Sequence, residues 1–341
     1  MENNFAKKLI KWYKINLRDL PWRKTNDPYK IWVSEIILQQ TRIDQGTPYY
    51  LNFINQFPNV KKLSESTLDE LMIVCQGIGY YSRIVNMHKC AKIVVIEYNS
   101  NFPTKYSELI KLPGIGDYTA SAISSICSGE SKMVVDGNVI RLFSRLYNLN
   151  YQQHSSIMKK TIKKIGEKEI LKFNSGDFNQ ALMDYGSMIC SPKKYKCDKC
   201  IFSKSCEAFK FDIVDELPVK KKNIIISQRF FNYFVVIDKS LKVKIHKRKE
   251  KDIWNNLYEF ELLETNNKIS VKDAETYLEE KHQRLSFKKK YQLSHKLTHQ
   301  VLSIDFWIFE VDEVFKYGID IPSLNNYPFP KPIFTIISKI Q

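Results

Sequence analysis

The 341-residue sequence has no run of about 18 consecutive apolar residues, the length that a membrane-spanning helix needs. Its N-terminus, MENNFAKKLIKWYK, carries lysines where a signal peptide needs its apolar stretch, so we expect neither export nor membrane insertion. Internal repeats and low-complexity tracts are also missing, which argues against a disordered or fibrous chain. We therefore expect a cytoplasmic protein of about two domains, each long enough to bury a core.

Acidic residues are scarce relative to basic ones: 37 Asp and Glu face 53 Lys and Arg, which leaves a formal net charge of +16. This excess favours a polyanionic partner such as DNA, which would associate the protein with the nucleoid. An AT-rich genome, which enriches lysine, is an alternative explanation of the same excess. The charge is spread along the chain, with local maxima at 220–222, 242–251 and 288–290.

The pattern of apolar residues changes after about residue 210. Before that point they recur at three- and four-residue spacing between Pro and Gly residues, which predicts an all-helical domain over 1–214. A charged, Pro-containing stretch at 215–225 is typical of a linker. Beyond it, β-branched and aromatic residues around one helix, 271–282, predict an α+β domain over 226–341. Further helices are expected at 5–17, 29–40, 67–75, 81–98, 105–111, 118–128, 138–147 and 178–188, and strands at 229–238, 242–247, 257–264 and 301–309.

The stretch LPGIGDYTA (112–120) places Gly114 and Gly116 between two expected helices, in a hairpin near 105–128. Both glycines permit positive φ. The backbone N–H groups of such a turn, together with the N-terminus of the following helix, can hold a phosphate oxygen. Because G-x-G alone is a weak signal, a generic tight turn explains the same residues.

Four of the seven cysteines fall within 190–206. In a cytoplasmic chain such a group favours a metal over disulfides, and four thiolates can hold a tetrahedral zinc ion or an iron–sulfur cube. Zinc usually takes two C-x2-C pairs, and this loop has one. The loop also carries lysines that can meet phosphates, whereas a staple that closes the helical domain is the purely structural alternative. The cysteines are Cys190, Cys197, Cys200 and Cys206.

Two carboxylates stand beside apolar runs. Glu35, in IWVSEIILQQT, shares a helical face with Ile31, Trp32 and Leu38, and a carboxyl on such a face tends to have the raised pKa of a proton donor. An ion pair with an arginine or lysine elsewhere is the alternative. Asp136, in VVDGNV, precedes an expected helix. Capping is the common role of Asp there, and an ionised carboxylate that stabilises positive charge is the other.

Eight segments along the helical region share their order and spacing with a known family. They are LPWR (20–23), PYKIWVSEIILQQT (28–41), PYY (48–50), GIGYYSR (77–83), LPGIGDYT (112–119), VDGNVIR (135–141), FNQALMDYGSMIC (178–190) and the cysteine loop with its six-two-five spacing. Together they resemble the MutY-type adenine DNA glycosylases of the endonuclease III superfamily.

The resemblance implies a multidomain fold: an all-α helix-hairpin-helix core with a 4Fe-4S cluster loop, followed by an α+β, Nudix-like recognition domain. It implies a base-excision repair enzyme that hydrolyses the N-glycosidic bond of adenine mispaired with 8-oxoguanine or guanine. Double-stranded DNA is then the partner, a 4Fe-4S cluster held by the four cysteines is the cofactor, and a monomer is the expected state.

Four catalytic residues follow from the same resemblance. Adenine is flipped out of the duplex into a pocket, because its reacting atoms cannot be reached in the stack. Glu35 protonates N7 of adenine and later acts as a base toward water. Asp136 stabilises the oxocarbenium-like sugar, or bonds to it transiently as in a retaining glycosidase. Tyr118 and Asn138 shape the site and form hydrogen bonds in it.

The resemblance also places residues on DNA. Gln40 and Tyr80 match the wedge positions that fill the gap left by the flipped base. A surface Gln at a helix end and a packed Tyr in a turn are the alternatives. One departure, Cys75 where the family usually has Trp, is expected to affect packing near the wedge. The complete set expected at the DNA is Arg23, Gln40, Thr41, Ile78, Tyr80, Gly114 and Gly116.

The second domain resembles the Nudix-like C-terminal domain of the same enzymes. It has no Nudix box G-x5-E-x7-R-E-U-x-E-E: AETYLEEKHQ (274–283) has acids without the Gly and Arg framework, so recognition is expected rather than pyrophosphate hydrolysis. LSHKLTH (293–299) resembles the F-S-H loop that detects 8-oxoguanine, with Leu297 and Thr298 in place of Phe and Ser. Thr298 keeps a hydroxyl, and Leu297 loses the ring. His299 completes the loop, or is an ordinary strand-edge histidine.

Two other functions fit parts of this pattern. A glycosylase/lyase of endonuclease III type uses a lysine that forms a Schiff base with the sugar. This chain has Tyr118 at that position, and a phenol cannot form the adduct. A non-catalytic DNA-binding iron–sulfur protein would keep the hairpin and cysteines but would not need Glu35 and Asp136 together. A monofunctional adenine glycosylase accounts for all of these residues.

Overall fold

The computed structural model describes residues 4–220 and 226–341. Its contacts divide the chain into two units: Met1–Glu65 with Asn86–Lys222, and Ser66–Val85 with Asn223–Gln341. The second unit therefore includes a short segment from the helical part of the sequence. Of the expected linker, 221–225 lies outside the described residues, whereas 215–220 packs on the first unit, where Leu217 is buried. The domain limits drawn from the sequence remain a prediction.

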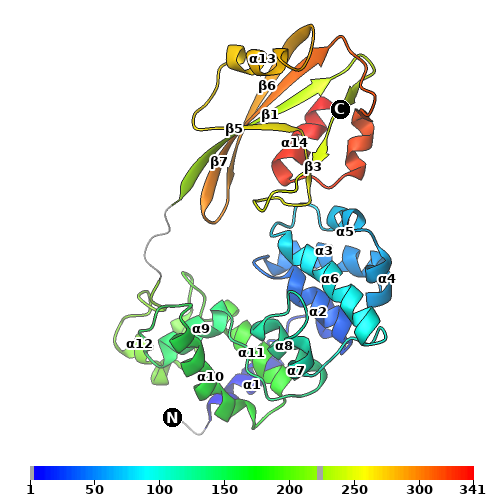
Figure 1. The fold of residues 1–341 in the computed structure, drawn as a ribbon. Coiled ribbons are helices and arrows are strands. Elements are labelled where there is room, and N and C mark those ends of the chain that lie inside the picture. Colours follow the sequence, from blue (N-terminus) through cyan, green and yellow to red (C-terminus); the bar gives the residue numbers. More distant parts are fainter. Residues whose placement is uncertain (1–3, 221–225) are drawn as a thin grey trace. The chain divides into compact units, whose positions relative to one another are not determined.

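The first unit is built from helices (Figure 1). Each helix expected in this part of the chain coincides with an observed one, and four more, α3, α4, α10 and α12, were not expected. The helices are α1 (Phe5–Ile15), α2 (Pro28–Ile37), α3 (Ile43–Gln56), α4 (Val60–Glu65), α6 (Ser82–Glu97, which begins in the second unit), α7 (Tyr106–Leu109), α8 (Asp117–Cys127), α9 (Gly137–Leu146), α10 (Ser156–Ile170), α11 (Ser175–Met188) and α12 (Glu207–Lys210), with short 3-10 turns η1 (Pro21–Arg23), η2 (Cys197–Lys199) and η3 (Ser203–Ser205).

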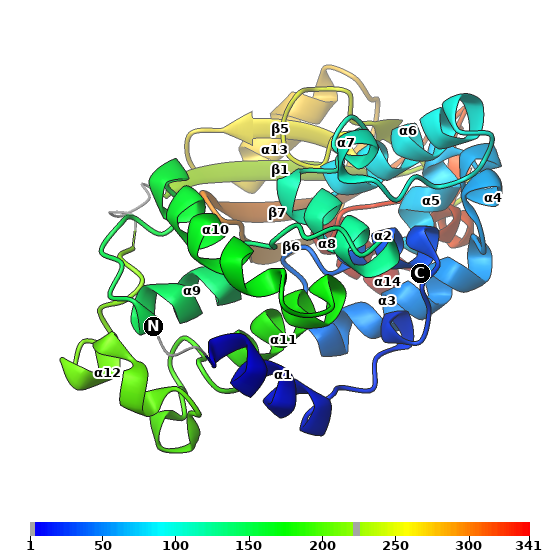
Figure 2. The same cartoon turned by 90° about the horizontal axis from the view of Figure 1, so that it is seen from below.

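Helix α11 is the centre of this unit. It lies beside α1 in both views and also packs against α8 and α9 (Figures 1 and 2). Its residues Phe178, Leu182 and Tyr185 are fully buried at helical spacing. Helix α2 packs on α8 in turn, and its start is fixed by the Asp27 carboxylate, which accepts the Tyr29 N–H at 2.9 Å. Helices α2, α8, α9 and α11 therefore bring Glu35, Tyr118 and Asp136 to one region of this unit.

The second unit contains a mixed six-stranded sheet within residues 226–341, in the order β6-β7-β1-β2-β8, with β5 also paired to β1. Strands β1 and β7 are parallel and the other pairs are antiparallel. The elements are α5 (Leu68–Val74), β1 (Ser227–Ile237), β2 (Lys242–Val243), β3 (His246–Lys247), β4 (Tyr258–Glu259), β5 (Glu261–Thr265), α13 (Val271–Glu279), β6 (Leu285–Lys296), β7 (Gln300–Val311), β8 (Ile319–Asp320), the 3-10 turn η4 (Ile321–Asn326) and α14 (Lys331–Ile340).

Both faces of the central strands are covered. On β1, Phe231 and Tyr233 belong to the core under α14, whereas Phe234 and Val236 belong to the core under α13. Successive side chains of a strand point to opposite faces, so a strand buried on both sides is apolar at nearly every position. The continuous apolar runs of the sequence thus identify the centre of the sheet.

Two expected strands are corrected by the structure. The segment 242–247 is not one strand: β2 pairs with β1 in the large sheet, whereas β3 pairs with β4 in a separate two-stranded sheet. The segment 257–264 is divided into β4 and β5 at the buried Phe260. No helix in 4–220 or 226–341 is long and apolar enough to cross a membrane.

Candidate active site

Glu35 lies on α2, one turn after the fully buried Trp32. Some of its surface stays accessible, but protein surrounds the carboxyl, and this burial raises its pKa to about 7. A hydrogen bond from Tyr118 and the charge of Arg23 oppose the rise, and the charge of Asp136 adds to it. Glu35 can therefore donate and regain a proton near neutral pH.

Tyr118 is the second residue of α8, directly after the glycine hairpin. Its hydroxyl lies 3.2 Å from the Sδ atom of Met183 and also hydrogen-bonds to Glu35. Burial, followed by the charges of Glu35 and Asp136, raises the pKa of Tyr118 well above its ordinary value of 10. The phenol therefore keeps its proton, and that proton has two possible acceptors.

Asp136 is the N-cap of α9, as the capping interpretation predicts. One carboxylate oxygen accepts the Val139 N–H at 2.8 Å, and the other accepts the Asn138 side-chain amide at 2.7 Å. Burial is the largest effect and leaves the pKa of Asp136 above its ordinary value, although these hydrogen bonds and the charge of Arg141 oppose the rise by favouring the ionised form. Capping holds the carboxylate in place, and there it interacts electrostatically with Glu35.

The turn that carries Asp136 and Asn138 is fastened by Arg141. The Nη2 atom of Arg141 donates to Asn138 Oδ1 at 2.8 Å and to the Gly186 carbonyl at 2.6 Å, and its Nε donates to the Cys190 carbonyl at 2.6 Å. Gly186 allows this packing because a Cβ atom there would lie 2.8 Å from the Asn138 carbonyl oxygen. The turn is thus clamped between α9 and the end of α11.

Two arginines are paired with a buried carboxylate on α11. Asp184, which is fully buried on α11, accepts hydrogen bonds from Arg23 at 2.7 and 2.9 Å and is also paired with Arg18. Arg23, expected at the DNA, therefore has both terminal nitrogens bound within the protein, and its charge still reaches Glu35. Arg23 is thus paired with Asp184 and not with Glu35.

Sequence patterns assign no role to several residues that the structure brings to this region, namely Arg18, Arg141, Met183, Asp184 and Gly186. All except Arg18 lie inside the motifs VDGNVIR and FNQALMDYGSMIC, so membership of those motifs is the signal that marks them. Their partners are more than forty positions away along the chain in most cases, as with Arg23 and Asp184 at a separation of 161.

The expected hairpin is present between α7 and α8. Gly114 has φ of +77°, and a Cβ atom there would lie 2.7 Å from the Cβ of Asn86, so the position needs glycine for two reasons. Gly116 has extended backbone, caps α8, and a Cβ atom there would meet nothing within 4 Å. The turn interpretation is confirmed at Gly114, whereas a side chain at Gly116, the N-cap of α8, would point into open space.

The two expected wedge residues both have left-handed backbone, with φ of 56° at Gln40 and 50° at Tyr80. Such conformations cost energy in non-glycine residues and concentrate at functional sites. Tyr80 is 49% exposed, so it is not a packed turn residue, and its hydroxyl lies 2.9 Å from Thr298 Oγ1 within the second unit. The side chain of Ile78, also expected at the DNA, is buried, and Thr41 donates to the Gln39 carbonyl at 3.3 Å.

Cys75, which stands where the family usually has Trp, is almost fully buried, and burial raises the pKa of its thiol to about 12. It is a packing residue, as the sequence comparison predicts.

The expected recognition loop is the turn between β6 and β7. Thr298 and His299 are exposed at its tip, and Leu297 is partly buried against the core under α14. The Leu297 N–H donates to the Gln300 carbonyl at 2.8 Å, which closes a tight hairpin. His299 therefore lies in the turn directly before β7, and its carbonyl accepts the Ser227 N–H of β1 at 3.1 Å.

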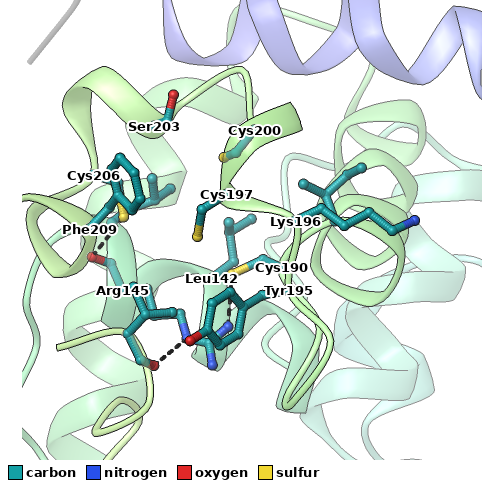
Figure 3. Close-up of a pocket in the computed structure, with 13 residues that line it drawn as sticks. Leu142, Arg145, Cys190, Tyr195, Lys196, Cys197, Cys200, Ser203, Cys206 and Phe209 are labelled. Carbon is teal, nitrogen blue, oxygen red and sulfur yellow. Dashed lines mark hydrogen bonds between the residues drawn. The ribbon is translucent and has the colours of Figure 1, made fainter. Parts of the chain in front are cut away.

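All four clustered cysteines line one cavity of about 370 Å³ including its open mouth (Figure 3). None forms a disulfide. Donors point at the sulfurs: Arg145 Nη1 lies 3.4 Å from Cys190 Sγ, and the Tyr185 hydroxyl lies 3.1 Å from Cys200 Sγ. Hydrogen bonds of this kind stabilise thiolates. Within 4–220 and 226–341, no three His, Cys, Asp or Glu side chains are placed to hold a single metal ion.

Two family models match the chain. One describes the HhH-GPD superfamily of base excision DNA repair proteins and matches residues 33–168, and the other describes the NUDIX domain and matches residues 232–339. A solved structure described as a thermostable thymine-DNA glycosylase superposes with a TM-score of 0.57 at 28% identity, over 61% of this chain and 95% of that one. A trapped endonuclease III–DNA covalent intermediate has a TM-score of 0.54 at 20% identity over the same shares, which shows a common fold. The fold and these matches together show that the chain is a base-excision DNA repair protein with a Nudix-like domain.

The curated relatives narrow this class. The adenine DNA glycosylase of Buchnera aphidicola subsp. Schizaphis graminum is 37% identical over 98% of this chain and 97% of its own length. The adenine DNA glycosylase of Homo sapiens is 34% identical over 60% of this chain and 39% of its own length. The chain belongs to the adenine DNA glycosylase family. It is a hydrolase that acts on N-glycosyl bonds, with DNA as its substrate, in base excision repair.

Proposed function

We propose that the protein removes adenine paired with 8-oxoguanine, or with guanine, from duplex DNA by hydrolysis alone. The observation that carries this proposal is Glu35: a carboxyl with a pKa of about 7 lies beside the phenol of Tyr118 and within electrostatic reach of Asp136. Asp136 accepts two hydrogen bonds that favour its ionised form, from the Val139 N–H and the Asn138 amide, so the two carboxyls can divide the acid role and the charge-stabilising role between them.

The chemistry follows from these residues. Once the base has been flipped from the stack, protonated Glu35 transfers its proton to N7 of adenine, and the bond between C1′ and N9 breaks with its electrons passing to the base. Ionised Asp136 stabilises the positive charge that develops on the sugar, or bonds to C1′ as in retaining glycoside hydrolysis. Water then attacks C1′ and gives its proton to Glu35. Asn138 holds the Asp136 carboxylate during these steps.

Tyr118 supports a monofunctional reaction. A lyase needs an amine to form a Schiff base with the opened sugar, and the side chain at this position is a phenol that keeps its proton. The chain therefore stops after base removal.

DNA is held by two kinds of contact. The backbone at Gly114 and Gly116 binds a phosphate at the start of α8, a contact that positions the duplex without specifying its sequence. Gln40 and Tyr80 act as wedges beside the flipped base, supported by their left-handed backbone. The other residues assigned to the DNA are Arg23, Thr41 and Ile78.

The base opposite adenine is recognised by the tip of the β6–β7 hairpin. Leu297, Thr298 and His299 form this tip, and Thr298 is within hydrogen-bonding distance of the exposed wedge Tyr80. This contact supports recognition of the damaged base by residues of the second unit. A monomer is the proposed state of the protein.

Cys190, Cys197, Cys200 and Cys206 fit a 4Fe-4S cluster. Four thiols around one cavity, with N–H and O–H donors aimed at their sulfurs, are the donor set that such a group requires. When bound, the cluster supplies a charged core that ties the 190–206 loop together, and the exposed lysines of the loop then face outward toward DNA phosphates. Iron and acid-labile sulfide in equal amounts, without stoichiometric zinc, are expected in the purified protein.

Single-turnover release of adenine from duplexes with A opposite 8-oxoguanine, G or T tests the function. We expect release from the first two duplexes, loss of release in Glu35→Gln, and no adduct after borohydride treatment. Tight binding to all duplexes without release would instead support a non-catalytic DNA-binding protein, and a borohydride-trapped adduct would support a lyase.

A further inference from the structure

The hydroxyl of Tyr118 has two potential hydrogen-bond acceptors, a carboxyl and a thioether. Its oxygen is 3.2 Å from the Sδ atom of Met183 on α11, and it also hydrogen-bonds to Glu35 on α2. A phenol has one proton to donate, and a thioether can only accept. The acceptor that receives the Tyr118 proton therefore depends on whether Glu35 is ionised.

Two arrangements satisfy this geometry. When Glu35 is ionised, its carboxylate is the stronger acceptor, and Tyr118 donates to it. When Glu35 is protonated, its own O–H can donate to the Tyr118 oxygen, and the phenol proton then needs another acceptor. The Met183 sulfur lies where that acceptor is needed. Without it, the phenol O–H would be left unpaired in a largely desolvated site whenever Glu35 carries its proton, and an unpaired polar group in such a site is costly.

We propose that Met183 is a positioning residue for adenine release: its sulfur accepts the Tyr118 proton and so favours the protonated form of Glu35. The inference rests on the proposed acid role of Glu35 and adds to it a residue outside the four expected catalytic positions. Sulfur is a weak acceptor, so the effect is a bias between two protonation states rather than an all-or-none requirement.

The charged groups around Glu35 come from several elements, and Met183 leaves them unchanged. Tyr118 faces Glu35 from α8, Asp136 from the start of α9, and the charge of Arg23 acts from η1, where Asp184 of α11 is bound to it. Since methionine is uncharged, replacing it alters the hydrogen bond of the phenol without altering this set of charges.

The test is the pH dependence of single-turnover adenine release for Met183→Leu and Met183→Gln. Leucine has nearly the same volume and accepts no hydrogen bond, so the fall in rate with rising pH should move to lower pH by about 0.5–1 unit. The rate should match the wild type at acidic pH, where Glu35 is protonated in both proteins, and fall by about three- to tenfold above neutrality. Glutamine offers a carbonyl oxygen at a similar reach and should restore the wild-type profile or move it to higher pH.

Met158→Leu is the matched control. Met158 is fully buried on α10, and its Sδ atom lies 3.7 Å from the Ser144 hydroxyl, so this substitution also removes a hydroxyl–sulfur contact from the core. The pH profile should not move. In a Tyr118→Phe background, which has no phenol proton to place, Met183→Leu should likewise leave the shape of the profile unchanged.

The outcomes separate this inference from the function on which it rests. If Glu35→Gln still releases adenine, the acid role of Glu35 is wrong. If Glu35→Gln is inactive while Met183→Leu keeps the wild-type profile, or loses rate equally at acidic and alkaline pH, only the role of Met183 is overturned. Circular dichroism and DNA binding of Met183→Gln check the fold independently of Met183→Leu.

Discussion

Replacing Glu35 with Gln should stabilise the folded protein at alkaline pH while it abolishes adenine release. Burial raises the pKa of Glu35 to about 7 in the folded chain, against an ordinary value of 4.5. The folded state therefore binds this proton more tightly than the unfolded state does. Between the two pKa values the free energy of unfolding falls as pH rises, because the folded state must then hold a buried charge.

The size of this effect follows from the pKa difference of about 2.5 units, at about 1.4 kcal/mol per unit. Glutamine has nearly the shape of glutamate, can still accept a hydrogen bond from Tyr118, and carries no charge. We expect Glu35→Gln to exceed the wild type in free energy of unfolding by about 3 kcal/mol at about pH 8. Near pH 4 both proteins are uncharged at this position, and the difference should vanish.

Urea unfolding followed by far-ultraviolet circular dichroism, at acidic and at alkaline pH, measures this difference. Glu167, an exposed residue of α10, gives the control: Glu167→Gln should change stability by less than about 0.5 kcal/mol at either pH. Equal stability of Glu35→Gln and the wild type at alkaline pH would refute the reasoning, because it would mean that the carboxyl is ionised there at no cost.

Two further substitutions test the framework of the site. Asp184→Asn should cost about 3–5 kcal/mol in urea unfolding, because it leaves two arginines without their buried partner, whereas Asp19→Asn, which breaks the exposed pair with Lys24, should cost less than about 1 kcal/mol. Gly114→Ala should lower the free energy of unfolding by about 1–3 kcal/mol through its positive φ and its contact with Asn86. Gly116→Ala should keep wild-type stability and weaken duplex binding in a filter-binding titration; wild-type affinity for DNA in this variant would contradict the phosphate assignment.

The strands of the second unit could be predicted where burial makes their pattern unambiguous. In β1 and β7 both faces are covered, so apolar residues occupy most positions, and the buried polar residues Asn232 and Asp305 are the main exceptions. Strand β6 was not expected because it is an edge strand that pairs only with β7, and its sequence, LSFKKKYQLSHK, places lysines on an exposed edge. Helix α14 was not expected either, because IFTII is rich in β-branched residues. Packing against the sheet outweighs that local preference.

The candidate site could be predicted only in part, because its contacts join residues that are far apart in the sequence. Motifs locate Glu35 and Asp136, and helical periodicity indicates that both border a core. Neither signal says which distant side chain meets them. Arg18 and Asp184 are 166 positions apart, and Tyr118 and Met183 are 65 apart. Such pairs are set by how α11 packs against α1, α8 and α9, which is a property of the assembled fold.

Met183 and Asp184, two neighbouring residues of α11, both favour the protonated form of Glu35. The charge of Arg23 lowers the pKa of Glu35, and an acid catalyst with its pKa pulled back toward 4.5 would hold few protons at neutral pH. Asp184 accepts hydrogen bonds from both terminal nitrogens of Arg23 and is also paired with Arg18, so its carboxylate offsets the positive charge that lowers the pKa of Glu35. Met183, one position earlier, accepts the phenol proton that would otherwise favour the ionised carboxyl. Asp184→Asn should therefore lower the pH at which adenine release declines, in addition to its cost in stability, and the Asp19→Asn control should leave that pH unchanged.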